Sequence, residues 1–159
     1  MPTQVAEREL AIQTFEFCRE VEIAAPTEVT FEAVLAELGP EGTMPDGQSL
    51  SMKIEPWPGG RWYRDLGNNA GHLWGHVQVI KPRTLLEICG PMFVSYPAVN
   101  HLQYRLTGQR ESTMLKITHR AHGYLPKGFL DGAEQGWNHA IKRIREIAER
   151  MRSARVRSW

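Results

Sequence analysis

The chain has 159 residues, a length that suits one domain able to bury roughly two-thirds of its unfolded surface. Its net charge of +1 provides no general attraction to nucleic acid or to an anionic membrane. No apolar run approaches the roughly 20 residues of a membrane span, and the mixed N-terminal sequence lacks the apolar core of a signal peptide. We therefore expect a cytoplasmic protein with no nucleic-acid partner and no membrane span.

The first predicted elements are a strand and a short helix. Apolar and charged side chains alternate at residues 15–23, which predicts a half-buried strand, while residues 1–14 are expected to form an N-terminal arm. After Pro26, apolar residues recur at helical spacing and stop at Gly39, a natural helix end. Residues 39–49 are turn-forming throughout and predict a mobile loop.

Six more strands are predicted from alternating patterns separated by turn residues. They lie at residues 50–55, 61–65, 72–80, 85–89, 100–106 and 113–121. Short turns without intervening helices indicate an antiparallel meander. Apolar residues then keep the i, i+3, i+4, i+7 spacing from Ala133 to Met151, which predicts one long amphipathic helix over about 127–152.

These elements predict an α+β helix-grip fold, in which a seven-stranded curved antiparallel sheet holds the long C-terminal helix on its concave face. The domain is expected to cover residues 15–152, followed by a frayed tail at 153–159. Four arginines lie near this end: Arg150, Arg152, Arg155 and Arg157. They are interpreted as part of a frayed helix end whose positive charge complements the helix dipole, the alternative being contact with an acidic partner.

Neither cysteine nor histidine spacing predicts a metal or redox centre. Cys18 and Cys89 are too few for a disulfide framework or a zinc site, and both are interpreted as buried reduced thiols. His72 and His76 would stand roughly 13 Å apart on an extended strand. There is no nucleophile elbow, phosphate-binding loop or dinucleotide fingerprint. No metal, cofactor or catalytic residue is assigned.

Five local motifs follow one another along the chain: Ile23 to Phe31 at the start of the first helix, Pro58-Gly59-Gly60-Arg61-Trp62, Gly75-His76-Val77 with Pro82 to Leu86, Leu115 to His119, and Gly136-Trp137. The order of elements resembles the START/Bet v 1-like (SRPBCC) superfamily, and these motifs resemble its Hsp90 ATPase activator-like branch. The resemblance implies the helix-grip fold with a cavity between sheet and helix. Because the superfamily includes carriers, cyclases and stress proteins, the resemblance does not fix the function.

The candidate ligand-binding residues are inward-facing or near strand ends: Trp62, Trp74, Met92, Tyr96, Tyr104, Leu106, Ile117, His119 and Trp137. An aromatic lining with few polar groups is typical of a site for a small apolar molecule, although each ring could instead simply fill the core. His119 and Tyr104 share a face on neighbouring strands. A buried imidazole there either orients a ligand or moves a proton, or is a core histidine satisfied by Tyr104 or a backbone group.

Three functions remain open at this point. The preferred one is binding of a small apolar or aromatic molecule, admitted near the loop at 39–49, because it requires only the cavity. The second is an enzyme of the cyclase or hydratase type, in which His119 or Tyr104 moves a proton. The third, implied by the name of the branch, is a module that contacts a chaperone ATPase. The sequence indicates no docking surface for such a partner. The sequence is also compatible with a homodimer.

Overall fold

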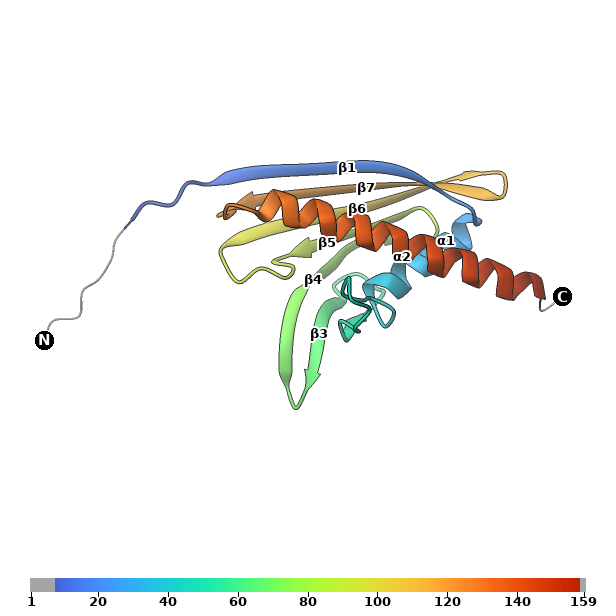
Figure 1. Cartoon of the computed structure of the whole chain (residues 1–159), viewed down its shortest axis with the longest axis horizontal. Helices are drawn as coiled ribbons and strands as arrows, with labels where there is room; N and C mark the ends of the chain where they lie inside the picture. Colours follow the sequence, from blue (N-terminus) through green and yellow to red (C-terminus); the bar gives the residue numbers. More distant parts are fainter. Residues whose placement is uncertain (1–7, 158–159) are drawn as a thin grey trace, which may run out of the picture.

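Residues 8–157 are described by the structure, a computed structural model, and form seven strands and two helices. The strands are β1 (Gln13–Ile23), β2 (Met52–Ile54), β3 (Arg61–Gly67), β4 (Ala70–Lys81), β5 (Leu85–Gly90), β6 (Ala98–Gln109) and β7 (Ser112–Gly123). The helices are α1 (Thr27–Leu38) and α2 (Phe129–Arg157). Figure 1 shows the sheet with α2 lying across it, so the predicted helix-grip fold is confirmed.

The sheet is antiparallel throughout, with the order β1-β7-β6-β5-β4-β3-β2. Strands β2 to β7 form the predicted meander, and β1 joins its far edge by pairing with β7. Register shifts interrupt the β3–β4 and β4–β5 pairs. At the end of the β4–β5 pair, a Cβ on Gly90 would lie 2.4 Å from the Cα of Gly75, so only glycine allows this approach. Such irregularities bend a sheet and help to make it concave.

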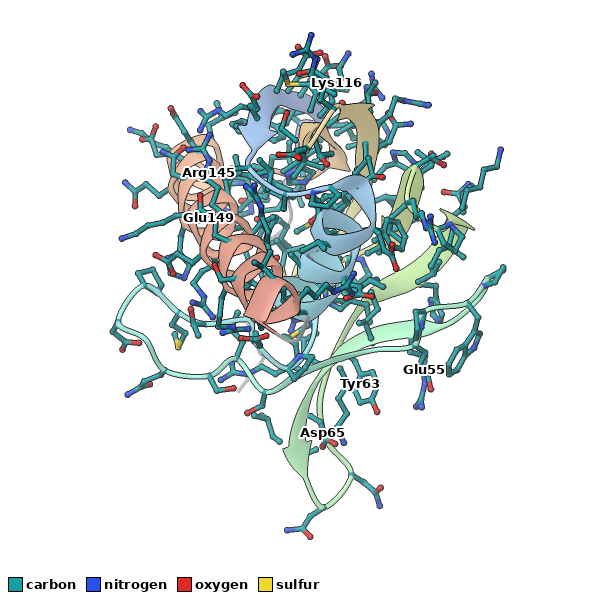
Figure 2. All side chains as sticks on the ribbon, turned by 90° about the vertical axis from the view of Figure 1, so that its right-hand side faces the viewer. Glu55, Tyr63, Asp65, Lys116, Arg145 and Glu149 are labelled. Atoms are coloured by element: carbon teal, nitrogen blue, oxygen red, sulfur yellow. The ribbon has the colours of Figure 1, made fainter. Side chains whose placement is uncertain are left out.

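Helix α2 buries its apolar stripe against the concave face. Ile144, Ile147 and Ala148 are fully buried. Arg145 and Glu149 extend from the opposite, solvent-facing side of the helix (Figure 2). Helix α1 packs beside α2 and also contacts β6 and β7, so the two helices together cover the sheet. Neither helix within residues 8–157 is long and apolar enough to cross a membrane.

The end of α2 differs from the predicted one. The helix begins at Phe129 and continues to Arg157, five residues beyond the predicted end at 152. Its arginines bind groups of the same chain: Arg152 donates to the Ala24 carbonyl (2.8 Å), and Arg155 donates to the Glu32 carboxylate (2.6 Å). These contacts explain why the helix continues beyond its apolar stripe.

The termini are described only in part. Residues 1–7 of the predicted arm and 158–159 of the predicted tail lie outside the described residues. Within the described chain, β1 begins at Gln13, two residues before the predicted strand.

The prediction of two buried thiols is wrong for Cys18, which is exposed, whereas Cys89 is half-buried. Cys18 alternates with the inward-facing Phe17 and Arg19 and therefore faces outward from β1, where its Sγ lies 3.7 Å from the Thr118 hydroxyl. Both thiols are free.

Candidate functional site

A pocket of about 380 Å³ lies between the first half of α2 and the concave face of the sheet. Six of the nine predicted residues line it: Trp62, Trp74, Met92, Tyr104, His119 and Trp137. The other three do not. Leu106 and Ile117 are buried in the main core, and Tyr96 packs against a second, smaller apolar cluster beside Tyr124. The volume falls at the lower end of the range for small-molecule sites.

A second hollow, of about 390 Å³, lies at the outer side of β1, β6 and β7. Its charged groups Glu16 and Arg120 are already paired with each other at 2.9 Å, and His101 is paired with Glu87 at 3.0 Å. Since it lies on the surface and not between the two layers of the fold, we place the candidate site in the first pocket.

The pocket has an aromatic wall held by ring contacts. Trp62 and Trp74 meet edge to face with centroids 5.1 Å apart, and Trp74 meets Phe93 at 5.9 Å. Trp62 also donates its indole N–H to the Leu38 carbonyl at 2.7 Å. Across the pocket, Trp137 and Tyr104 lie 6.0 Å apart. Rings fixed in this way form a largely preformed apolar surface.

Small residues of α2 create the space opposite these rings. Gly132, Ala133, Gly136 and Ala140 line the pocket, and a Cβ added at Gly132 or Gly136 would meet no atom within 4 Å. Glycine in a helix interior costs about 1 kcal/mol relative to alanine, so two glycines one turn apart weaken the helix at the point where it faces the pocket. The glycines are visible in the sequence, but the space that they leave open can be recognised only when the opposing sheet is in place.

His119 is a fully paired core histidine. Its Nδ1 accepts a hydrogen bond from the Trp137 indole N–H at 3.0 Å. Its Nε2–H therefore donates to the side-chain oxygen of Asn100 at 2.8 Å, and Asn100 in turn donates to the Pro91 carbonyl at 3.2 Å. Burial lowers the pKa of His119 to about 4, which keeps the ring neutral. The hydrogen-bond partners of His119 are therefore Asn100 and Trp137 and not Tyr104, and the strand pattern indicated neither of them.

Glu37 is a pocket residue that sequence reasoning missed. It follows Thr30, Ala33 and Val34 by seven, four and three positions, and these three residues are buried, so Glu37 extends from the buried face of α1. Burial raises the pKa of its carboxyl to about 8, although the charge of Arg143 acts in the opposite direction. The sequence signal that could have identified Glu37 was a glutamate on the same helix face as these buried residues.

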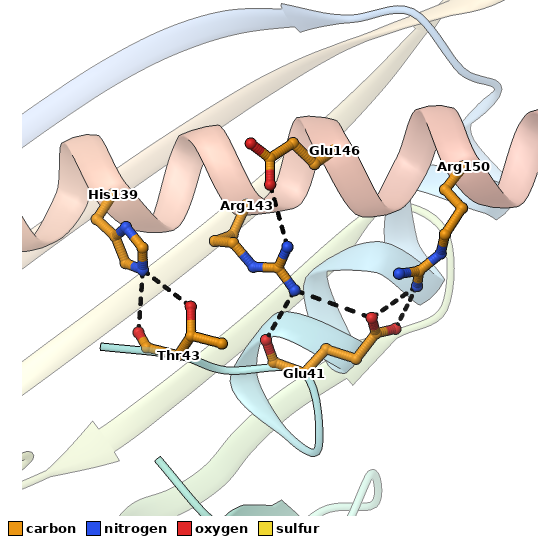
Figure 3. A network of polar contacts seen from close by, with 6 residues as sticks. All are labelled: Glu41, Thr43, His139, Arg143, Glu146 and Arg150. Carbon is orange, nitrogen blue, oxygen red and sulfur yellow. Dashed lines mark hydrogen bonds and ion pairs between the residues drawn. The ribbon is translucent and has the colours of Figure 1, made fainter. Parts of the chain in front are cut away.

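The segment 40–50 closes one side of the pocket through Thr43, Met44 and Pro45. It is tied to α2 by a polar network (Figure 3). The Nε2–H of His139 donates to the Thr43 carbonyl at 3.0 Å, and Arg143 donates to the Glu41 carbonyl at 3.2 Å. Arg150 binds the Glu41 carboxylate at 2.6 and 2.7 Å.

We expect His139→Ala to loosen segment 40–50 without affecting the rest of the fold. A typical hydrogen bond contributes about 1 kcal/mol, so its loss should raise local opening roughly fivefold. Hydrogen–deuterium exchange of the segment measures this, and Glu149→Ala on the exposed side of α2 is the control. Unchanged exchange in the segment would contradict the role assigned to His139.

Comparisons with known proteins find the same fold. No protein-family model and no curated protein matches the chain. An uncharacterized protein from Rhizobium leguminosarum superimposes with a TM-score of 0.71 at 16% identity, over 90% of this chain and 99% of its own. Ara h 8.0201, a Bet v 1 homologue, gives 0.62 at 16% identity, over 87% and 98%. CalU16 from Micromonospora echinospora gives 0.59 at 18% identity, over 95% and 94%.

These likenesses show the fold of the chain. The chain has the helix-grip fold seen in START/Bet v 1-like proteins, so the expectation drawn from the order of its elements is confirmed for the fold. At 16% to 18% identity, such likenesses concern the fold alone.

Proposed function

We propose that the pocket between α2 and the sheet binds a small, largely apolar or aromatic molecule. The observation that carries the proposal is the combination of an aromatic wall with an opposing helix surface reduced to glycine and alanine at Gly132, Ala133, Gly136 and Ala140. Because Gly132 and Gly136 are exposed, the space beside them opens to solvent and leaves the aromatic wall within reach of a small molecule. Burial of apolar surface would supply most of the affinity.

The enzyme alternative, in which His119 or Tyr104 moves a proton, is weakened for both residues. Burial raises the pKa of Tyr104 well above its ordinary value, so its hydroxyl gives up a proton less readily. His119 is limited by its hydrogen bonds. Its two ring nitrogens are taken by Trp137 and Asn100, and its low pKa leaves it a poor base. We therefore propose binding without turnover as the function of this pocket.

A dye-binding experiment tests the proposal. The wild-type protein should bind the uncharged dye N-phenyl-1-naphthylamine saturably, with a rise in dye fluorescence. Gly136→Leu should weaken binding by roughly tenfold or more, because the added side chain occupies open space in the pocket. The variant should melt no lower than the wild type, since leucine is the better helix former.

Gly136→Ala is the matched control, because it improves the helix in the same way but fills little of the pocket. It should keep near-wild-type affinity. The proposal fails if the wild type binds no dye, or if Gly136→Leu remains folded and binds as tightly as Gly136→Ala.

We further infer membership of the Hsp90 ATPase activator-like branch, which rests on the motifs. In support, Pro58-Gly59-Gly60 falls in the turn between β2 and β3, where Gly59 has φ of +82° and a Cβ on Gly60 would meet the Glu55 carbonyl at 2.0 Å. Two free thiols suit the cytoplasmic location that we propose. Contact with a chaperone ATPase and formation of a homodimer are alternatives that no particular surface of residues 8–157 favours.

A further inference from the structure

The polar groups of the pocket wall fall into two sets. In the first, hydrogen bonds within the chain are already made: Trp62 donates to the Leu38 carbonyl, and His119 bonds with Asn100 and Trp137. In the second are groups to which residues 8–157 supply no hydrogen bond: the buried indole N–H of Trp74, the buried Nε of Arg64, and the Glu37 carboxyl and Tyr104 hydroxyl, which face the pocket. Buried polar groups are nearly always paired, so the Trp74 and Arg64 groups indicate a missing partner in the pocket, and the Glu37 and Tyr104 groups are open to the same partner.

Glu37 and Tyr104 lie close enough to affect each other. They reach the pocket from α1 and β6, and burial, together with the charge of Glu37, raises the pKa of Tyr104 well above its ordinary value. Tyr104 is 1% exposed. An uncharged carboxyl and a phenol in an apolar site are both hydrogen-bond donors. The Trp74 indole is a donor only.

We propose that Glu37 and Tyr104 jointly bind the oxygen of a carbonyl group carried by an apolar, ring-containing ligand. This inference rests on the proposed function, because it concerns the same pocket. A carbonyl oxygen has two lone pairs and no proton, so it accepts from two donors at once. A purely apolar ligand would cover both donors without pairing either of them, which is unfavourable. An ammonium ligand would instead require an ionised Glu37.

Charged and titratable groups from several elements line the pocket beside Glu37 or act on its charge. Arg143 and His139 belong to α2, Arg64 to β3, His119 to β7 and Tyr104 to β6. Their effect on binding must be separated from that of Glu37. The variant Glu37→Gln does so, because its amide still donates a hydrogen bond but does not titrate.

The test compares three naphthalenes by equilibrium dialysis at pH 6 and pH 9. These are 2-acetylnaphthalene, its apolar isostere 2-ethylnaphthalene, and the permanent cation trimethyl(2-naphthylmethyl)ammonium. At pH 6 the acetyl compound should bind roughly tenfold more tightly than the ethyl compound, and this preference should fall at pH 9 as Glu37 ionises. Glu37→Gln should retain the preference at both pH values. Glu37→Met and Tyr104→Phe should each reduce it at pH 6.

The outcomes separate the two proposals. If no naphthalene binds the folded protein, the proposed function itself fails. If the ethyl compound binds as well as the acetyl compound, the pocket exists but the carbonyl site does not. Tightest binding of the cation, increasing at pH 9, would overturn the carbonyl site in favour of an ammonium site. A preference for the acetyl compound that survives in both Glu37→Met and Tyr104→Phe would overturn the assignment of these residues.

Discussion

Glu37→Gln should make the protein more stable at pH 8 and leave it unchanged near pH 4. The folded-state pKa of Glu37 is raised from 4.5 to about 8, so the folded protein holds this proton more tightly than the unfolded chain. Stability is therefore lost as pH rises from about 4.5 to about 8, and none is lost at lower pH, where both states are protonated. At pH 7 the penalty has an upper limit of about 3 kcal/mol, because the side chain is only partly buried.

Thermal unfolding at several pH values measures this effect. For a domain of this size, a gain of a few kcal/mol should raise the melting temperature by roughly 5–10 °C. Titration of other groups, including His119, is common to both proteins and cancels in the comparison. Equal melting temperatures of wild type and variant at pH 8 would mean that Glu37 ionises in the folded protein without cost.

Ile144→Asp should abolish the cooperative fold. Ile144 is fully buried where α2 meets the concave face of the sheet, in a cluster of apolar side chains. Burial of an unpaired charge belongs to the most destabilising class of substitutions, with an expected loss above about 4 kcal/mol. Circular dichroism during heating should show no cooperative transition.

Two variants make this result interpretable. Lys142→Asp puts the same charge on the exposed side of α2, two residues away, and should melt within a few degrees of the wild type. Ile144→Ala should fold with a loss of roughly 2–5 kcal/mol. If Ile144→Asp melted like the wild type, α2 would not be docked on the sheet in solution.

The fold could be predicted from the sequence because each strand and helix buries one of its sides, and the spacing of apolar residues shows which side that is. The alternation at residues 15–23 and the helical spacing in α2 directly record which side faces the core. The end of α2 could not be predicted in this way. Beyond Met151 the helix is held by arginines that bind Ala24 and Glu32, and contacts between distant segments leave no periodic pattern.

The sequence could predict which side of the sheet the pocket lies on, but not how far the pocket extends. Alternation places Tyr104 and Leu106 on the same face of β6, but it does not tell how far along the strand the space extends, and Leu106 lies beyond it. Glu37 was missed because a charged residue at the end of a short helix is usually solvated. Gly136 was recognised only as part of a motif. The space that a glycine leaves open becomes apparent only when the position of the opposing sheet is known.

The two ends of α2 are attached by different forces, so dissolved ions act on them differently. Phe129 and Ala133 anchor the first turns by apolar packing against Leu125. The last turns are held mainly through charge, as in the pairing of Arg155 with Glu32. At 1 M salt the Debye length is about 3 Å, which weakens exposed ion pairs, while sulfate strengthens apolar contacts. Ionic strength thus loosens the end remote from the pocket and leaves the end beside it in place.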